Sequence, residues 1–170
     1  MVGFVFAGVL GTLLHFLFDW SGGSAVAALF SGVNESIWEH TKLLFYPMLL
    51  FALLEYKVWG RGVSNFWCVK LQGILLGLTL IPVIYYTYTG AFGASLDWFN
   101  VAIFFIVAAV AYYWQAKRMQ TERSCKVPAW VPIAAIALLI TAYTVFTFFP
   151  PRIPLFQDPV TGTRGFYAIG

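Results

Sequence analysis

The residues best suited to chemistry in this sequence fall within one stretch of nine, residues 34–42. The stretch contains an amide, two carboxylates, an imidazole and an ammonium group, carried by Asn34, Glu35, Glu39, His40 and Lys42. Charged residues make up only 10% of the 170-residue chain, so a cluster of this density is not expected from the composition alone. Neutral imidazole with carboxylate is a ligand set for Zn²⁺, Fe²⁺ or Mn²⁺. Without metal, the same groups could act as general acid and base or as a proton relay.

A second ionisable pair, His15 and Asp19, lies near the end of the first apolar run. Gly3, Ala7 and Gly11 continue its four-residue spacing toward the N-terminus. Residues four apart lie on nearly the same face of a helix, and small residues permit a close helix crossing. Ionisable groups inside a membrane normally face a partner or a water-filled cavity. We therefore expect His15 and Asp19 to face a neighbouring helix, either as a structural hydrogen bond or as part of a site.

The composition indicates that membrane-spanning helices position these residues. The chain is 61% hydrophobic, whereas soluble domains are about 45–50% apolar and about 25% charged. Because a span needs about 20 apolar residues, we predict a single all-α bundle with five transmembrane helices. They are expected at residues 3–20, 36–59, 67–86, 96–115 and 129–149, followed by a tail at 150–170. The first span lacks a basic segment before it and is expected to be retained rather than cleaved.

The connection between the first two spans should place residues 34–42 beside the end of the first helix. Residues 25–30 are too few to span, so we predict a short interfacial or re-entrant segment. Asn34 is the expected N-cap of the next helix, with Glu35 in its first turn. Glu39 would then share a helix face with Glu35, and Lys42 could neutralise it. The alternative is an amphipathic turn whose charges meet only water and lipid headgroups.

Two further features bear on the second helix and on the cysteines. Pro47 removes one backbone hydrogen bond, and we expect a kink that frees the carbonyl of Leu43. Cys68 and Cys125 have no metal-binding spacing. Both are expected near the cytoplasmic face, where a disulfide is not expected.

The basic residues predict the orientation. Seven of the ten lie in the second and fourth connections, namely Lys57, Arg61, Lys70, Lys117, Arg118, Arg123 and Lys126. By the positive-inside rule, the N-terminus is then cytoplasmic and the tail is outside. Both histidines and five of the seven acids fall on the outer side, the acids being Asp19, Glu35, Glu39, Asp97 and Asp158. Ionisable groups therefore gather near the outer membrane face.

Three segments resemble a family of small bacterial multi-pass membrane proteins. They are HFLFDW at 15–20, VNESIWEH at 33–40 and the tail PPRIPLFQDPVTG at 150–162. The resemblance covers essentially the whole chain. The family has no assigned function, so the resemblance implies a five-span protein of the bacterial cytoplasmic (inner) membrane and no particular activity.

We predict an outward-facing pocket that holds a divalent metal and supports hydrolysis of a lipid-like or phosphate-bearing substrate. The expected metal ligands are His15, Asp19, Glu39 and His40. The expected catalytic groups are Glu35, Glu39 and His40. The expected substrate-binding residues are Asn34, Lys42, Arg152, Asp158 and Arg164. The HExxH motif of metalloproteases is absent from the sequence, so the metal prediction depends on the clustering alone.

Two other classes of function fit the same residues. In a small cation- or proton-coupled transporter or channel, the cluster would bind the ion and the kink at Pro47 would gate it. In an accessory subunit, the cluster would contact another protein of a membrane complex, and a homo-oligomer is equally compatible. The lipid bilayer is the expected surrounding. Nucleic acid is not an expected partner, because the basic residues are few and flank the membrane.

Overall fold

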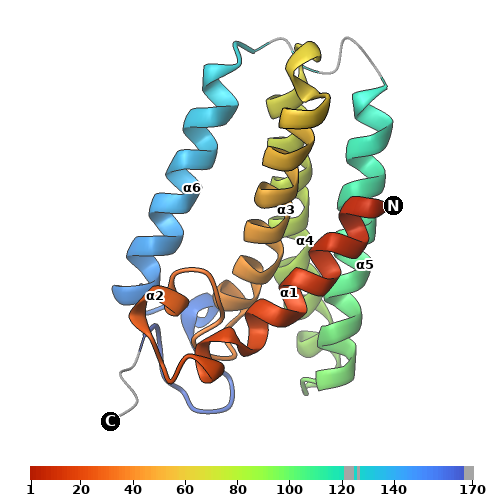
Figure 1. The fold of residues 1–170 in the computed structure, drawn as a ribbon. Coiled ribbons are helices and arrows are strands. Elements are labelled where there is room, and N and C mark those ends of the chain that lie inside the picture. Colours follow the sequence, from red (N-terminus) through yellow and green to blue (C-terminus); the bar gives the residue numbers. More distant parts are fainter. Residues whose placement is uncertain (121–124, 126, 167–170) are drawn as a thin grey trace.

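The structure, a computed structural model, describes residues 1–120, 125 and 127–166, and its long elements are all helices (Figure 1). The five long helices are α1 (Val2–Trp20), α3 (Ile37–Val58), α4 (Phe66–Phe92), α5 (Asp97–Met119) and α6 (Trp130–Phe148). The short elements are α2 (Ala25–Ala28), η1 (Gly60–Gly62) and η2 (Pro154–Phe156). The single turn of α2 is too short to span, as expected.

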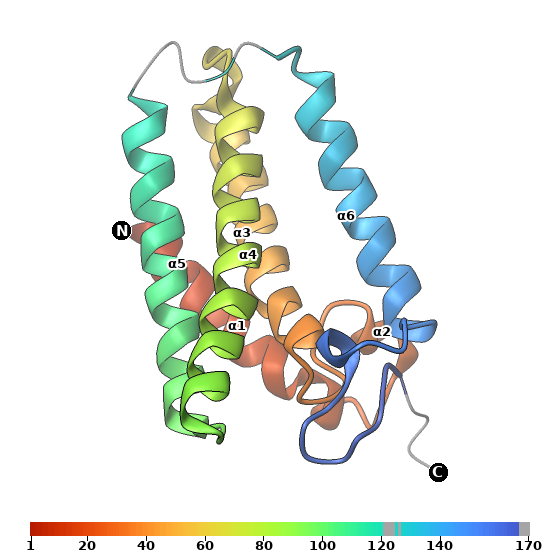
Figure 2. The same cartoon turned by 180° about the vertical axis from the view of Figure 1, so that it is seen from behind.

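Four of these helices are long and apolar enough to cross a membrane: α1, α4, α5 and α6. The second predicted span, α3, is not among them, because its ends carry polar residues that lower its mean hydropathy. It is nevertheless the central helix, in contact with both α1 and α4 (Figures 1 and 2). Two helices also run further than predicted, α4 to Phe92 and α5 to Met119.

Helix α1 crosses the bundle obliquely, with its N-terminus beside the middle of α5 (Figures 1 and 2). The small residues of its stripe make this approach possible. A Cβ atom on Gly3 would lie 2.5 Å from the ring of Phe51 and 2.6 Å from that of Tyr112. The stripe therefore packs α1 against α3 and α5, as its spacing predicts.

The backbone of α1 comes close to α3 one turn before the proline of α3. The helix continues through Pro47, which has no N–H to offer the carbonyl of Leu43. A Cβ atom on Gly11 would lie only 2.6 Å from that carbonyl oxygen, so the backbone of α1 covers it. His15 lies one turn further along α1 and is thereby brought to the first turns of α3.

Ion pairs close the two ends of the packed core. Leu44, Phe45, Ile74 and Val107 are fully buried in its centre. At one end Glu39 pairs with Lys42 within α3, and at the other end Glu55 of α3 pairs with Lys70 of α4. The first pair confirms that Lys42 can neutralise Glu39.

The chain after α6 returns to the end of the bundle that carries residues 34–42 (Figure 1). The backbone N–H of Phe166 donates to the carbonyl of Thr147 at 2.7 Å. The ring of Trp38 lies between Tyr143 and Phe156, with centroid distances of 4.6 and 4.8 Å. The described part of the tail is therefore folded onto the helices.

The expectation that the cysteines stay unpaired is wrong in this structure. Cys68, in the first turn of α4, and Cys125, after α5, form a disulfide with their Cα atoms 6.3 Å apart. The physical reason is that α4 and α5 are packed neighbours of opposite direction, so the start of one lies near the end of the other (Figure 2). Because disulfides persist in oxidising compartments, this bond stands against the predicted cytoplasmic position of that end.

Candidate metal centre

The centre begins with the cap of α3, which differs from the prediction. Ser36 is the N-cap, and its hydroxyl oxygen accepts the backbone N–H of Glu39 at 3.4 Å. Asn34 instead closes a turn before the helix, because its side-chain oxygen accepts the N–H of Ser36 at 2.9 Å. Glu35 therefore precedes the helix, and the expectation that it shares a helix face with Glu39 is wrong.

Three side chains with metal-binding atoms converge at this point: His15 of α1, Glu35 of the turn before α3, and His40 of α3. One ligand atom from each lies within 4.8 Å of the other two. His40 Nε2 is 3.4 Å from Glu35 Oε2, and the rings of His15 and His40 have centroids 5.6 Å apart. The histidine of the first span and the polar stretch of the next helix are thus neighbours, as the sequence predicts.

The hydrogen bond of His40 fixes the role of each ring nitrogen. His40 Nδ1 is 3.0 Å from the carbonyl oxygen of Ser36, which can only accept, so Nδ1 carries the proton and donates it. In the neutral ring, Nε2 then directs a lone pair toward the carboxylate of Glu35. A metal ion bound by both atoms would be compatible with this arrangement. A backbone carbonyl holding the other ring nitrogen is also the usual arrangement behind a metal-binding histidine.

The spacing of two of these atoms, from Glu35 and His40, suits a small divalent ion. Ligand atoms about 2.0–2.2 Å from a tetrahedral zinc ion lie about 3.3–3.6 Å from one another. The 3.4 Å between His40 Nε2 and Glu35 Oε2 matches such an edge. The side chain of His40 is 31% exposed and that of Glu35 is 53% exposed, so a fourth position can be reached by water or substrate. Three protein ligands with one open position is the pattern of catalytic rather than structural zinc sites.

Two of the predicted ligands lie outside this group. Asp19 is exposed at the end of α1 and is not part of the group of three. Glu39 is buried, and its Oε2 accepts Lys42 Nζ at 2.5 Å and the N–H of Val33 at 3.1 Å. Its carboxylate is therefore engaged within the protein core.

Lys42 was predicted to bind substrate, but it is fully buried. Besides Glu39, its ammonium group donates to the carbonyl of Ala28 at 2.8 Å and to the hydroxyl of Thr147 at 2.9 Å. All three of its N–H bonds are thus used, and they join α2, α3 and α6. Lys42 holds this end of the bundle together.

The other predicted substrate-binding residues have different surroundings. Asn34 donates to the carbonyl of Gly165 at 3.2 Å. The carboxylate of Asp158 accepts backbone N–H groups of the chain and a hydrogen bond from the side chain of Thr161. Arg164 donates to the side chain of Gln157. Arg152 is exposed on the tail and so remains accessible to a ligand.

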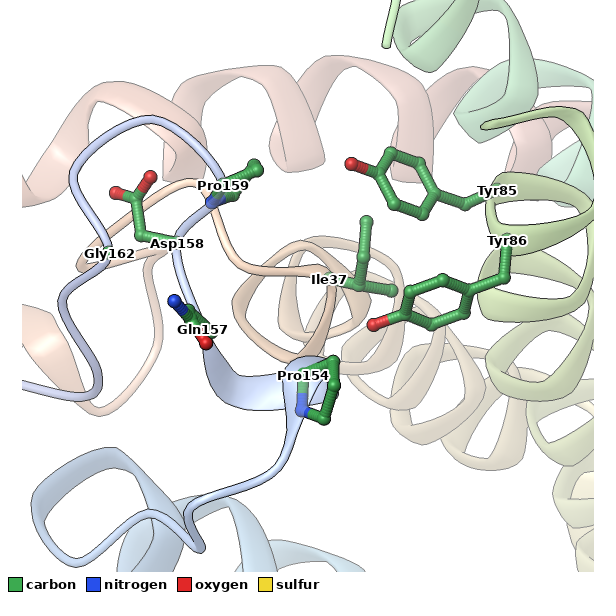
Figure 3. Close-up of a pocket in the computed structure, with 8 residues that line it drawn as sticks. All are labelled: Ile37, Tyr85, Tyr86, Pro154, Gln157, Asp158, Pro159 and Gly162. Atoms are coloured by element: carbon green, nitrogen blue, oxygen red, sulfur yellow. The ribbon is translucent and has the colours of Figure 1, made fainter. Parts of the chain in front are cut away.

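A shallow groove of about 220 Å³ lies between α4 and the tail (Figure 3). Tyr85 and Tyr86 point from α4 toward the tail, with Ile37 between them and Pro159 (Figure 3). The residues lining it do not include the three ligand candidates. Its edge nevertheless includes Asp158, which also touches the segment that carries Glu35.

Comparison with known proteins places the chain among proteins without an assigned role. The model of DUF6512, a family of unknown function, matches residues 1–166. The chain belongs to this family. The match agrees with the expected membership of an uncharacterised family over essentially the whole chain. No curated protein and no solved structure matches the DUF6512 chain, so the case for a function depends on its own residues.

Sequence reasoning missed the two roles of Ser36. Its hydroxyl caps α3, and its backbone carbonyl accepts a hydrogen bond from His40 Nδ1. The signal was present, because Ser36 and Glu39 have the spacing of a capping box. Sequence reasoning also placed Glu35 among the catalytic groups rather than among the ligands. Once the helix begins after Ser36, Glu35 can turn toward the open side of His40.

Proposed function

We propose that this protein is a five-span protein of the bacterial cytoplasmic membrane that binds one divalent metal ion, zinc being the best fit. His15, Glu35 and His40 are its ligands, and the bound ion supports hydrolysis of a phosphate-bearing or lipid-like substrate. The observation that carries the proposal is the convergence of these three side chains within 4.8 Å at an exposed end of the bundle.

The chemistry follows from the ligand set and its exposure. A divalent ion with an open position activates water for attack on an ester or phosphate and withdraws charge from the oxygen it contacts. The protein contributes the orientation of His40 through Ser36 and an accessible side for substrate. Arg152, exposed on the tail at the same end, is a suitable partner for an anionic headgroup.

In the proposed topology, α3 is the fifth span. Its apolar middle lies between α1 and α4, and its polar first turns lie at the outer membrane face. The basic residues Lys57, Arg61 and Lys117 support a cytoplasmic position for the opposite end by the positive-inside rule. We give this charge bias more weight than the disulfide of Cys68 and Cys125 at that end, which favours the reverse orientation. The centre and the tail then share the outer face, where a substrate from the outer leaflet can reach both.

A surface enzyme is favoured over a transporter by the packing beneath the centre. Gly11 lies directly against the carbonyl of Leu43, so the backbones of α1 and α3 are in contact one turn below His15. Leu44 and Phe45 fill the adjoining core and have no exposed surface. An ion could pass from the centre toward the membrane interior only if the backbones of α1 and α3 moved apart at this contact.

The proposal is tested by hydrolysis assays on the purified full chain in detergent, loaded with one equivalent of zinc. Chromogenic phosphate esters and short-chain carboxylic esters are the probes. We expect zinc-dependent turnover that falls at least about 100-fold in Glu35→Gln, because a ligand is lost. Asp19→Asn is the matched control, since it removes an exposed carboxylate from the same end, and it should retain activity. Stoichiometric zinc without hydrolysis of either probe class contradicts the hydrolase assignment.

A further inference from the structure

The segment that carries the ligand Glu35 is held at three successive residues. The N–H of Val33 donates to Glu39 Oε2 at 3.1 Å, and the side-chain amide of Asn34 donates to the carbonyl of Gly165 at 3.2 Å. The N–H of Glu35 itself donates to Asp158 Oδ2 at 3.2 Å. The backbone of the ligand segment is thus fixed between α3 and the C-terminal tail, while the Glu35 side chain stays half exposed.

Asp158 links the tail to this segment through the two oxygens of one carboxylate. Oδ1 accepts the N–H groups of Val160 at 2.7 Å and Thr161 at 3.1 Å, closing a turn in the tail. Oδ2 accepts the N–H of Glu35. The residue is only 4% exposed, so water does not replace these donors easily. The carboxylate therefore fixes the shape of the tail and the place of Glu35 at once.

The charge on Asp158 is maintained by these donors. Burial by itself raises the pKa of its carboxyl, but the N–H groups of Thr161, Val160 and Glu35 together with the side chain of Thr161 outweigh that effect and bring the pKa below its ordinary value. Asp158 is thus an ionised acceptor at neutral pH. An ionised acceptor makes a stronger hydrogen bond to a backbone N–H than a neutral one.

We propose that Asp158 is a positioning residue for the metal ligand Glu35, and that the folded tail fixes the geometry of the centre. The inference rests on the proposed metal site. His15 and His40 project from long helices, whereas Glu35 lies in a turn and has no helical hydrogen bonds of its own to fix it. Groups that hold metal ligands in place change metal affinity by about 10–100-fold when they are removed.

The test measures the zinc affinity of the full chain by competition with a chromogenic chelator, together with the absorption spectrum of the Co²⁺-loaded protein. Asp158→Asn keeps the size of the side chain but offers only one acceptor oxygen, so it cannot hold both the tail turn and Glu35. Thr163→Ala is the matched control, because it alters the same tail loop through the hydroxyl contact with Thr161 and leaves the hydrogen-bond partners of Asp158, Glu35 included, in place.

We expect Asp158→Asn to weaken zinc binding about 10–100-fold and to change the Co²⁺ spectrum, with Thr163→Ala like wild type in both. A merely structural role would lower the melting temperature and leave the spectrum of the folded protein unchanged, which overturns the proposal. Affinity within twofold of wild type also overturns it and leaves the metal site standing. A wild-type chain that binds no zinc removes the metal site and this inference together. If Asp158→Asn does not fold, Asn34→Ala tests the second link between segment and tail, with the same expected and contrary results.

Discussion

Lys42→Met removes the ammonium group that joins three helices at the end of the bundle carrying the metal centre. Methionine has nearly the same length, so the principal loss is of charge and hydrogen bonds. Glu39, 1% exposed, would then keep only the N–H of Val33 as a described partner for its carboxylate. The carbonyl of Ala28 and the hydroxyl of Thr147 would each lose a donor. Removing one partner of a buried ion pair costs about 3–5 kcal/mol, and we expect a loss of that size in the free energy of unfolding.

The assay is unfolding of the purified protein by SDS in mixed micelles, followed by circular dichroism. A double variant, Glu39→Gln with Lys42→Met, separates loss of the pair from loss of packing, because it leaves no uncompensated charge. We expect it to be more stable than Lys42→Met alone by about 1 kcal/mol or more, since interacting residues couple by about 0.5–3 kcal/mol. A loss below about 1 kcal/mol in Lys42→Met, or strictly additive effects in the double variant, would refute the reasoning.

Three further predictions concern the helix crossing, the cysteines and the tail. Gly11→Val places a side chain against the carbonyl of Leu43, and because overpacking costs about 1–3 kcal/mol we expect that loss in SDS unfolding; an unchanged unfolding free energy contradicts the contact. Cys68 and Cys125 are joined by a disulfide, so alkylation of the protein followed by mass spectrometry should find both cysteines protected until a reductant is added, and modification of both without reductant contradicts the bond. The ionised Asp158 has a lowered pKa, so its contribution is present above the ordinary aspartate pKa of about 3.9 and is lost as pH falls through the folded value. The difference in melting temperature between wild type and Asp158→Asn should therefore be constant from pH 7 to about 5 and shrink as the pH falls below about 4, and a difference that grows on acidification argues against this linkage.

Much of the helical architecture could be predicted because it follows from the apolar runs and from the polar and glycine-rich segments that separate them. Four predicted spans correspond to helices apolar enough to cross a membrane. The small-residue stripe of α1 also predicted its close packing. The approach of His15 to His40 followed from the short connection between their helices, which leaves the two elements little freedom to separate.

The start of α3 was mispredicted because two adjacent residues compete to cap it. Asn34 and Ser36 are both good N-caps, but only Ser36 has a glutamate three residues later, as a capping box requires. The side chain of Asn34 is used in the turn and on the tail. That shift of two residues moves Glu35 out of the helix. It therefore also changes which side chains can approach His15.

The positions of Asp19 and of the tail depend on packing that sequence spacing does not contain. Asp19 shares a helix face with His15, but the crossing angle of α1 decides which of them stays near α3. The contacts of Asn34 with Gly165 and of Glu35 with Asp158 join residues more than 120 positions apart. No local pattern predicts such a pairing, because it depends on where α6 ends and how the chain turns back.

The measurement that tests the central claim most directly is the metal content of the purified protein, combined with X-ray absorption at the zinc edge. We expect one zinc ion per chain with two imidazole ligands and one carboxylate, and loss of that ion in His15→Ala and His40→Ala variants that keep the wild-type circular dichroism spectrum. Substoichiometric zinc after loading, or occupancy that is unchanged in both variants, would contradict the account.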